Sequence, residues 1–218
     1  MKYARTKHLS FSPEIHSDDK AMSKEEESSL LNRYLYFSEK LDGGNTRLHK
    51  SCVGARSASL NADHGSFSRI KKLYRDLYYS NEFDFDRYIL YGENMQGIHS
   101  IEYDALKHPF YLFAALDTET NQIVSVQELE AISLETTFPL APSLGIHKFS
   151  KMKDLKKFIE EQQKLPSLIG GEREGVVLRI VEEFPVEEFE KHVVKYVRKG
   201  HVQCDSHWST DWKEAKFI

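Results

Sequence analysis

Cysteine is scarce in this chain, and long apolar runs are missing. Cys52 and Cys204 are the only two cysteines in 218 residues, so they supply neither a disulfide framework nor a paired metal site. No stretch approaches the roughly 18 apolar residues of a membrane span, and the N-terminus leads into polar residues instead of an apolar signal region. These absences favour a cytoplasmic protein with reduced cysteines and no segment inserted in a membrane.

Internal repeats and a strong excess of basic charge are also absent. The formal net charge of -4 argues against a wholly basic protein that coats nucleic acid, but it leaves room for a local basic groove. The hydrophobic content of 40% is that of an ordinary globular protein. We therefore expect one domain over residues 1–218, with the polar residues 1–22 as a partly ordered, flexible arm.

Apolar periodicity predicts an irregular alternation of strands and helices, and thus an α+β fold without a Rossmann fingerprint. Strands are expected at residues 34–38, 46–56, 87–91, 110–116, 175–181 and 193–197. A capping box at Ser23 and Glu26 predicts one helix start, and further helices are expected at residues 66–79, 151–163 and 185–190. Residues 42–45 then form the turn between the first two strands.

Four polar segments lie at the ends of these strands: Lys40–Asn45, Tyr91–Glu93, Glu174–Arg179 and Lys195–Arg198. Lys40 is placed to project into a cleft, where a neutral amine is a nucleophile toward phosphorus. Its pKa must then fall from ~10.4 toward neutrality, which desolvation and nearby positive charge both favour. Taken alone, Lys-x-Asp-Gly is equally a hairpin turn with a solvated lysine.

In order and residue type, the four segments resemble the signature of the covalent nucleotidyltransferases, which include DNA ligases, RNA ligases and mRNA capping enzymes. Asn45 favours the ATP-dependent RNA ligase branch, of phage and bacterial type, because the other branches usually carry arginine there. The resemblance implies a nucleotidyltransferase fold with two antiparallel sheets, flanked by helices, around an ATP cleft. It further implies ATP and Mg²⁺ or Mn²⁺ as cofactors, and the joining of 3′-hydroxyl to 5′-phosphate RNA ends through a lysyl-AMP intermediate.

The resemblance also assigns catalytic roles. Lys40 is the nucleophile, and Lys195 contacts the triphosphate. Glu93 contacts the ribose, Glu174 supports the water shell of the metal, and Asp42 shares these tasks, so all three carboxylates approach the metal through water. The alternative for both glutamates is an exposed charge at a strand end.

Nucleotide-binding residues follow in the same way. The carbonyl of Glu39 is expected to receive the adenine amino group, while Asn45 and Arg56 contact phosphate or sugar. Phe113 is expected to stack on the adenine, although the sequence alone does not separate it from Phe110, with Val177 or Val176 on the other face of the base. Lys195 and Arg198 hold the phosphates, but position 197 is valine, and strand alternation puts Arg198 on the opposite face from Lys195.

Other interpretations stay open or are disfavoured. A small DNA ligase and a non-catalytic nucleotide- or RNA-binding module are the alternatives, whereas Asn45 argues against a guanylyltransferase. The spacing of His201, Cys204 and His207 lacks a fourth zinc ligand, and the segment after Gly200 instead resembles the tail of some phage and bacterial RNA ligases. We expect no C-terminal OB-type domain, and we interpret the lysines of residues 148–157 as a solvated helix face.

Overall fold

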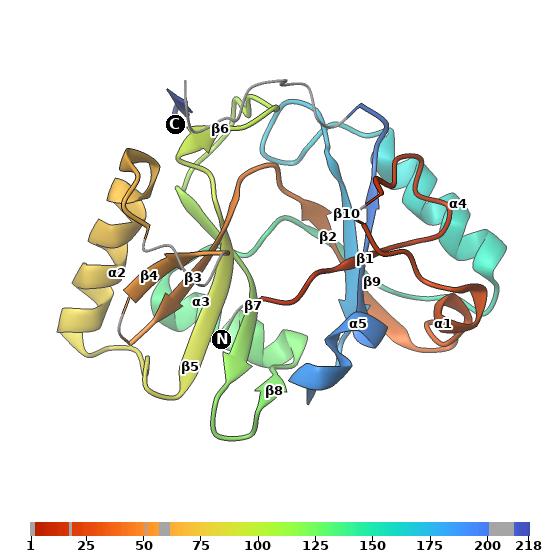
Figure 1. Cartoon of the computed structure of the whole chain (residues 1–218), viewed down its shortest axis with the longest axis horizontal. Helices are drawn as coiled ribbons and strands as arrows, with labels where there is room; N and C mark the ends of the chain where they lie inside the picture. The colour runs from red at the N-terminus through yellow and green to blue at the C-terminus, as the bar shows by residue number, and fades with distance from the viewer. Residues whose placement is uncertain (1–2, 18, 51, 57–61, 201–211) are drawn as a thin grey trace.

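The computed structural model describes residues 3–17, 19–50, 52–56, 62–200 and 212–218. Two large β-sheets face each other in Figure 1, with helices on their outer sides. All pairings within these two sheets are antiparallel except one short parallel pair at an edge. This arrangement confirms the predicted α+β fold with two antiparallel sheets flanked by helices.

The first sheet carries three of the four polar segments at or next to its strand ends. Its strand order is β1-β12-β10-β2-β9. The strands are β1 (Lys7–His8), β2 (Tyr34–Lys40), β9 (Ser143–Lys148), β10 (Gly175–Ile180) and β12 (Val193–Val197).

The second sheet has the order β11-β8-β7-β5-β3-β4. It comprises β3 (Gly44–His49), β4 (Cys52–Ala55), β5 (Tyr88–Asn94), β7 (Phe110–Asp117), β8 (Gln122–Ile123) and β11 (Phe184–Pro185). A separate short pair joins β6 (Gly97–Ile98) to β13 (Lys213–Glu214).

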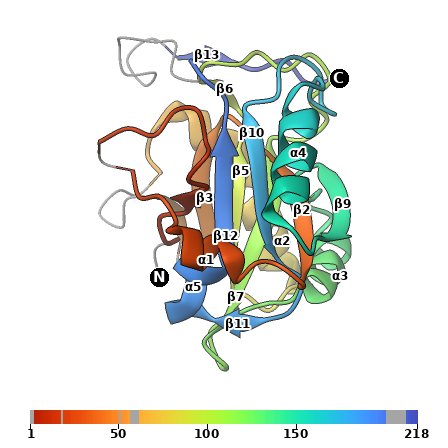
Figure 2. The same ribbon diagram turned by 90° about the vertical axis from the view of Figure 1, so that its right-hand side faces the viewer.

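Helices cover the outer faces of both sheets. The first is α1 (Lys24–Ser28), which begins with the predicted capping box: the Glu26 amide donates to Ser23 Oγ, and the Ser23 amide donates to the Glu26 carboxylate. Figure 2 shows α4 (Met152–Gln163) in front of the first sheet, where its Leu155 and Ile159 are fully buried. On the second sheet, α2 (Ser68–Ser80) follows the short 3-10 helix η1 (Gly65–Phe67), as the apolar spacing of residues 66–79 predicted.

Some elements differ from the sequence expectation. The helix predicted at residues 185–190 is a 3-10 turn, η2 (Val186–Glu188), followed by α5 (Phe189–His192). The helix α3 (Val126–Thr136) was not predicted, although its N-cap Ser125 and Glu128 have capping-box spacing. Strand β9 was missed because most of its residues are exposed or half-buried, so no apolar alternation marks it. Within the described residues, no helix combines the length and apolar character needed to cross a membrane.

The prediction of one strand over residues 46–56 and of a hairpin turn before it was wrong. The region holds two strands, β3 and β4, which pair antiparallel with His49 opposite Cys52. Strand β2 pairs with β10 and β9, whereas β3 pairs with β4 and β5, so the connection at residues 41–43 crosses from one sheet to the other. This crossing leaves Lys40 as the last residue of β2, at the point where the chain passes from the first sheet to the second.

The described part of residues 1–22 is packed onto the fold, although the sequence suggested a flexible arm. Strand β1 pairs in parallel with β12, and Leu9 and Met22 are buried in the core. Figure 1 shows the chain entering between the two sheets before it reaches β1. At this entry, the ring of Tyr3 lies 5.0 Å from those of Tyr91 and Phe113, measured between centroids.

Candidate active site

A cavity of about 550 Å³ lies between the two sheets, a volume in the range of small-molecule sites. Alternation along the strands selects its lining from the first sheet: Tyr36, Ser38 and Lys40 of β2 lie on one face, and Val177 and Arg179 of β10, opposite Ser38 and Tyr36, lie on the same face. The second sheet and the N-terminal segment complete the wall with Tyr3, Ala4, Thr6, Gly44, Asn45, Arg56, Glu93, His99 and Phe113.

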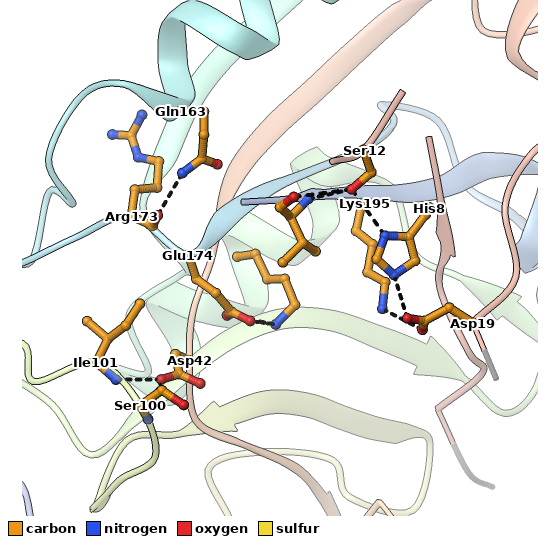
Figure 3. A network of polar contacts seen from close by, with 12 residues as sticks. His8, Ser12, Asp19, Asp42, Ser100, Ile101, Gln163, Arg173, Glu174 and Lys195 are labelled. Atoms are coloured by element: carbon orange, nitrogen blue, oxygen red, sulfur yellow. Dashed lines mark hydrogen bonds and ion pairs between the residues drawn. The ribbon is translucent and has the colours of Figure 1, made fainter. Parts of the chain in front are cut away.

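Lys40 and Glu174 form the central ion pair of this cavity. Lys40 Nζ lies 2.7 Å from each carboxylate oxygen of Glu174. Figure 3 labels Glu174 and marks an interaction at its carboxylate with a dashed line. The pairing follows from strand register, because Gly175 lies opposite Lys40 in the ladder between β10 and β2. The Lys40 side chain is 27% exposed and that of Glu174 is 4% exposed, so the amine is at the surface of the cavity and the carboxylate is behind it.

The carboxylates around Lys40 determine its protonation. Burial opposes the charged amine, but Glu174, Glu93 and Asp42 together outweigh burial and raise the pKa of Lys40. Burial also raises the pKa of Glu93 to about 8, with Glu174 and Asp42 adding to the effect and Lys40 opposing it. The expectation that the pKa of Lys40 falls is therefore not met by the protein alone.

Asp42 performs a structural task in addition to any catalytic one. Its Oδ2 accepts hydrogen bonds from the amides of Ser100 and Ile101, each at 2.7 Å, as drawn in Figure 3. The Asp42 amide donates to the hydroxyl of Tyr103 at 2.9 Å. Asp42 therefore fixes the loop that carries His99 to the cavity wall.

The carboxylates do not form a direct metal cage. No group of three or more histidine, cysteine, aspartate or glutamate side chains in the described ranges is arranged to hold a metal ion. Glu93 and Glu174 nevertheless lie beside Lys40, and the raised pKa of both carboxyls shows a site in which a further positive charge is favoured. Mg²⁺ keeps several waters and commonly takes one or two carboxylates plus phosphates. This donor set thus fits a hydrated divalent cation held jointly with a nucleotide.

The structure shows which of the candidate residues for contact with the adenine lie at the cavity. Phe113 lines the cavity, whereas Phe110 is fully buried against Phe138 in the second sheet's core. A bulge in the pairing of β5 with β7 makes Phe113 the additional residue at the cavity side. Val177 lines the cavity and Val176 is fully buried in the core.

Glu39, Asn45 and Arg56 all contribute to the cavity lining. The side chain of Glu39 points away from the cavity, where it pairs with Arg173, so its contribution to the lining is its backbone. Arg56 is exposed just beyond β4. These placements agree with the expected contacts to a nucleotide, which remain predictions.

The two cations proposed for the phosphates are placed differently. Lys195 lines the cavity, and its Nζ lies 3.5 Å from Asp19 Oδ1. Burial lowers the pKa of Lys195 while the charge of Asp19 opposes this. Arg198 lies outside the cavity lining and pairs with Glu172 at 2.8 Å. The structure therefore brings Lys195 to the cavity and leaves Arg198 outside its lining, so the expected joint placement of the two cations is not found. Strand alternation is the physical reason, because it puts the two side chains on opposite faces.

The neighbourhood of Lys195 includes residues that the sequence did not identify. Asp19 Oδ2 lies 3.3 Å from His8 Nε2, and His8 Nδ1 lies 3.2 Å from Ser12 Oγ, a chain of contacts drawn in Figure 3. Ser12 in turn exchanges hydrogen bonds with the backbone of Val197. The N-terminal segment thus holds the strand that carries Lys195.

Tyr3 and Arg179 also line the cavity without having been predicted. Arg179 has a signal in the sequence, since it follows Val177 by two positions and must share its face. Burial lowers the pKa of Arg179 to about 10, and the group donates to the carbonyls of Val124 and Ile180. Tyr3 has no such signal, because it lies in a polar segment. The disfavoured zinc ligands His201, Cys204 and His207 fall outside the described residues.

Solved structures of Naegleria gruberi RNA ligase are similar to this chain. A point mutant without ligand aligns with a TM-score of 0.61 and 17% identity, over 93% of this chain and 57% of that one. A point mutant with ATP and Mn aligns with a TM-score of 0.61 and 15% identity, over 93% and 58%. The ligase with PPi aligns with a TM-score of 0.57 and 18% identity, over 93% and 57%.

These structures support the fold, and this chain spans only 57% to 58% of their length. No match was found among curated proteins. A family model for RNA ligases, by contrast, matches residues 33–197, which is most of the chain. That range contains the ion pair of Lys40 with Glu174 and almost all of the four polar segments. The chain therefore belongs to the RNA ligase family, as the resemblance of its polar segments predicted.

Proposed function

We propose that the chain is an ATP-dependent RNA ligase that joins 3′-hydroxyl and 5′-phosphate ends through a lysyl-AMP intermediate. The observation that carries this proposal is Lys40, whose amine reaches the wall of a nucleotide-sized cavity and is held by the buried Glu174. Family membership supports the reaction class, and the ATP and Mn of the Naegleria structure support the cofactors. The proposal concerns the joining reaction of the catalytic domain.

In the first step, Lys40 Nζ attacks the α-phosphate of ATP, an N–P bond forms, and pyrophosphate leaves. The ammonium must first lose a proton, and the carboxylate of Glu174 at 2.7 Å is placed to accept it. Bound Mg²⁺ or Mn²⁺ would supply the positive charge that lowers the pKa of Lys40 and offsets charge on the phosphates. Lys195 would contact the leaving phosphates.

The base and sugar of ATP would occupy the rest of the cavity. Phe113 and Val177 line the cavity from opposite sheets and would hold the adenine between them, and Glu93 would contact the ribose. The AMP then passes from Lys40 to a 5′-phosphate end, and a 3′-hydroxyl displaces it to seal the strand. RNA ends are the proposed substrate, with DNA ends as the alternative.

Incubation with ATP labelled at its α-phosphate and Mg²⁺ tests the first step. Wild-type protein should retain label through denaturation, and Lys40→Ala should retain none. Lys164→Ala, at an exposed position beyond α4, is the matched control and should label like wild type. Label that persists on Lys40→Ala would exclude Lys40 as the nucleophile.

Further labelling and sealing assays separate the alternative functions. A non-catalytic binding module would bind ATP without covalent label, and a guanylyltransferase would label with GTP in preference to ATP. Sealing assays on matched RNA and DNA, both nicked and single-stranded, would distinguish an RNA ligase from a small DNA ligase. Faster sealing of DNA than of RNA would contradict the proposed substrate.

A further inference from the structure

A second ion pair lies directly behind the catalytic one. Glu39 Oε1 and Arg173 Nη2 are 2.9 Å apart, and each side chain is only 1% exposed. Glu39 immediately precedes Lys40, and Arg173 immediately precedes Glu174. Because side chains alternate along a strand, Glu39 points to the face opposite Lys40. The two chain segments that the Lys40–Glu174 ion pair joins at the cavity wall are therefore joined a second time on the opposite face of the sheet.

The segment that presents Glu174 needs such an anchor. Strand β10 begins at Gly175, so residues 172–174 precede the strand ladder. Arg173 fixes this coil: its guanidinium donates to the carbonyls of Pro166 and Gln162, as well as to Glu39. Its own carbonyl accepts a hydrogen bond of 2.7 Å from Gln163 Nε2, which Figure 3 shows beside Glu174.

Glu39 completes this anchor from the side of β2. Its carboxylate accepts hydrogen bonds from the hydroxyl of Ser167 at 2.6 Å and from the amide of Leu168 at 2.7 Å, in addition to the one from the guanidinium of Arg173. The end of β2, the loop after α4 and the coil before β10 thus meet at one carboxylate. An apolar pair of similar size often stabilises a protein as well as a buried ion pair does. What the ion pair adds is directional hydrogen bonds, which fix the position of the coil before β10 relative to the end of β2.

We propose that the Glu39–Arg173 ion pair is a positioning device for lysyl-AMP formation, which holds the coil before β10 so that the Glu174 carboxylate stays aligned with Lys40 Nζ. This inference rests on the proposed function. Both side chains act through their neighbours: Arg173 is absent from the cavity lining, and the Glu39 carboxylate is turned away from the cavity toward Arg173. A displacement of about 1 Å at a reacting group lowers a rate by about 100-fold, so a small shift of Glu174 should be measurable.

The variants Arg173→Met, Glu39→Gln and the double variant test the proposal in single-turnover labelling with ATP. Each single variant should lower the maximal labelling rate by about 10- to 100-fold and change the half-saturating ATP concentration less than about threefold. The double variant should be no slower than the slower single variant, since both changes break one contact.

Arg87→Met is the control, because Arg87 forms an ion pair with Asp117 at 2.7 Å outside the cavity lining, although its side chain is 38% exposed. Thermal unfolding of every variant identifies losses of labelling rate that are explained by lower stability alone. Arg87→Met should lower the unfolding temperature while leaving the labelling rate within about twofold of wild type. If the control loses rate in step with Arg173→Met, or if folded Arg173→Met labels at the wild-type rate, the proposal is wrong.

A measurement without ATP separates this proposal from the proposed function. Crystal structures of the nucleotide-free Arg173→Met and Arg87→Met proteins measure the position of the Glu174 carboxylate. In Arg173→Met this carboxylate should lie further than 2.7 Å from Lys40 Nζ, whereas in Arg87→Met the distance should be unchanged. An unchanged 2.7 Å contact in Arg173→Met would overturn the positioning role whether or not the chain forms lysyl-AMP.

Discussion

Glu93→Gln should make the nucleotide-free protein more stable at alkaline pH, although it alters a residue assigned to the active site. Burial raises the pKa of Glu93 from 4.5 to about 8, with support from Glu174 and Asp42 and opposition from Lys40. The folded protein therefore holds a proton on Glu93 in a pH range where the unfolded chain has already released it. Ionised Glu93 is therefore an unfavourable buried charge that Lys40 compensates only in part.

The sign and size of the effect follow from this difference. Between pH 4.5 and about 8, the unfolded state binds fewer protons at Glu93 than the folded state, so the free energy of unfolding falls as pH rises. The loss is at most about 1.4 kcal/mol per pH unit, or about 5 kcal/mol over the whole range. Glutamine has no proton to release, so Glu93→Gln lacks this part of the pH dependence.

Urea unfolding of wild type and Glu93→Gln at about pH 5.5 and about pH 8 measures the difference. The variant should gain stability relative to wild type by about 2 kcal/mol or more between these conditions. Glu183→Gln, at an exposed position, is the control and should follow wild type. A stability difference between Glu93→Gln and wild type that does not change with pH would refute the reasoning.

Substitutions at four further positions have distinct expected outcomes. Phe113→Ala should raise the half-saturating ATP concentration for labelling by about tenfold, because about 1–3 kcal/mol of stacking is lost. Phe110→Ala should instead lower the free energy of unfolding by about 3–5 kcal/mol. An ATP requirement raised by Phe110→Ala and not by Phe113→Ala would contradict this site. Lys195→Met should weaken ATP use by about tenfold or more, since a charged contact to phosphate contributes about 1.5–3 kcal/mol, and unchanged ATP titration would remove Lys195 from the site. Tyr3→Ala should lower stability by about 2 kcal/mol and raise the ATP requirement, while Tyr3→Phe, which keeps the ring packed, should do neither in the same assays.

The sequence was sufficient to predict the architecture and the centre of the site. Strand alternation and the order of the polar segments placed Lys40 and Glu93 correctly at a cavity between two sheets. Arg198 was predicted to hold the phosphates with Lys195, but it lies outside the cavity lining. Local periodicity predicted the strands, whereas the two-sheet cleft was implied by the resemblance of the polar segments.

Contacts between distant segments were beyond the reach of that reasoning. Asp42 binds the backbone of Ser100 and Ile101, and nothing in the local pattern of either segment predicts the other. Tyr3 reaches the cavity because β1 joins β12, a pairing that two residues of polar sequence do not reveal. The elevated pKa of Lys40 likewise arises from carboxylates that only the folded chain brings together.

The pairing of β2 with β10 has a consequence for the biogenesis of the protein. Lys40 and its partner are 134 positions apart, so this contact belongs to the high-contact-order class that forms late and slowly. On a translating ribosome, the strand bearing the nucleophile emerges long before its neighbour is synthesised. Its apolar outer face must meanwhile be shielded from intermolecular association, by transient collapse or by chaperones. Premature termination anywhere upstream of β10 should therefore give an aggregation-prone fragment instead of a partly active one.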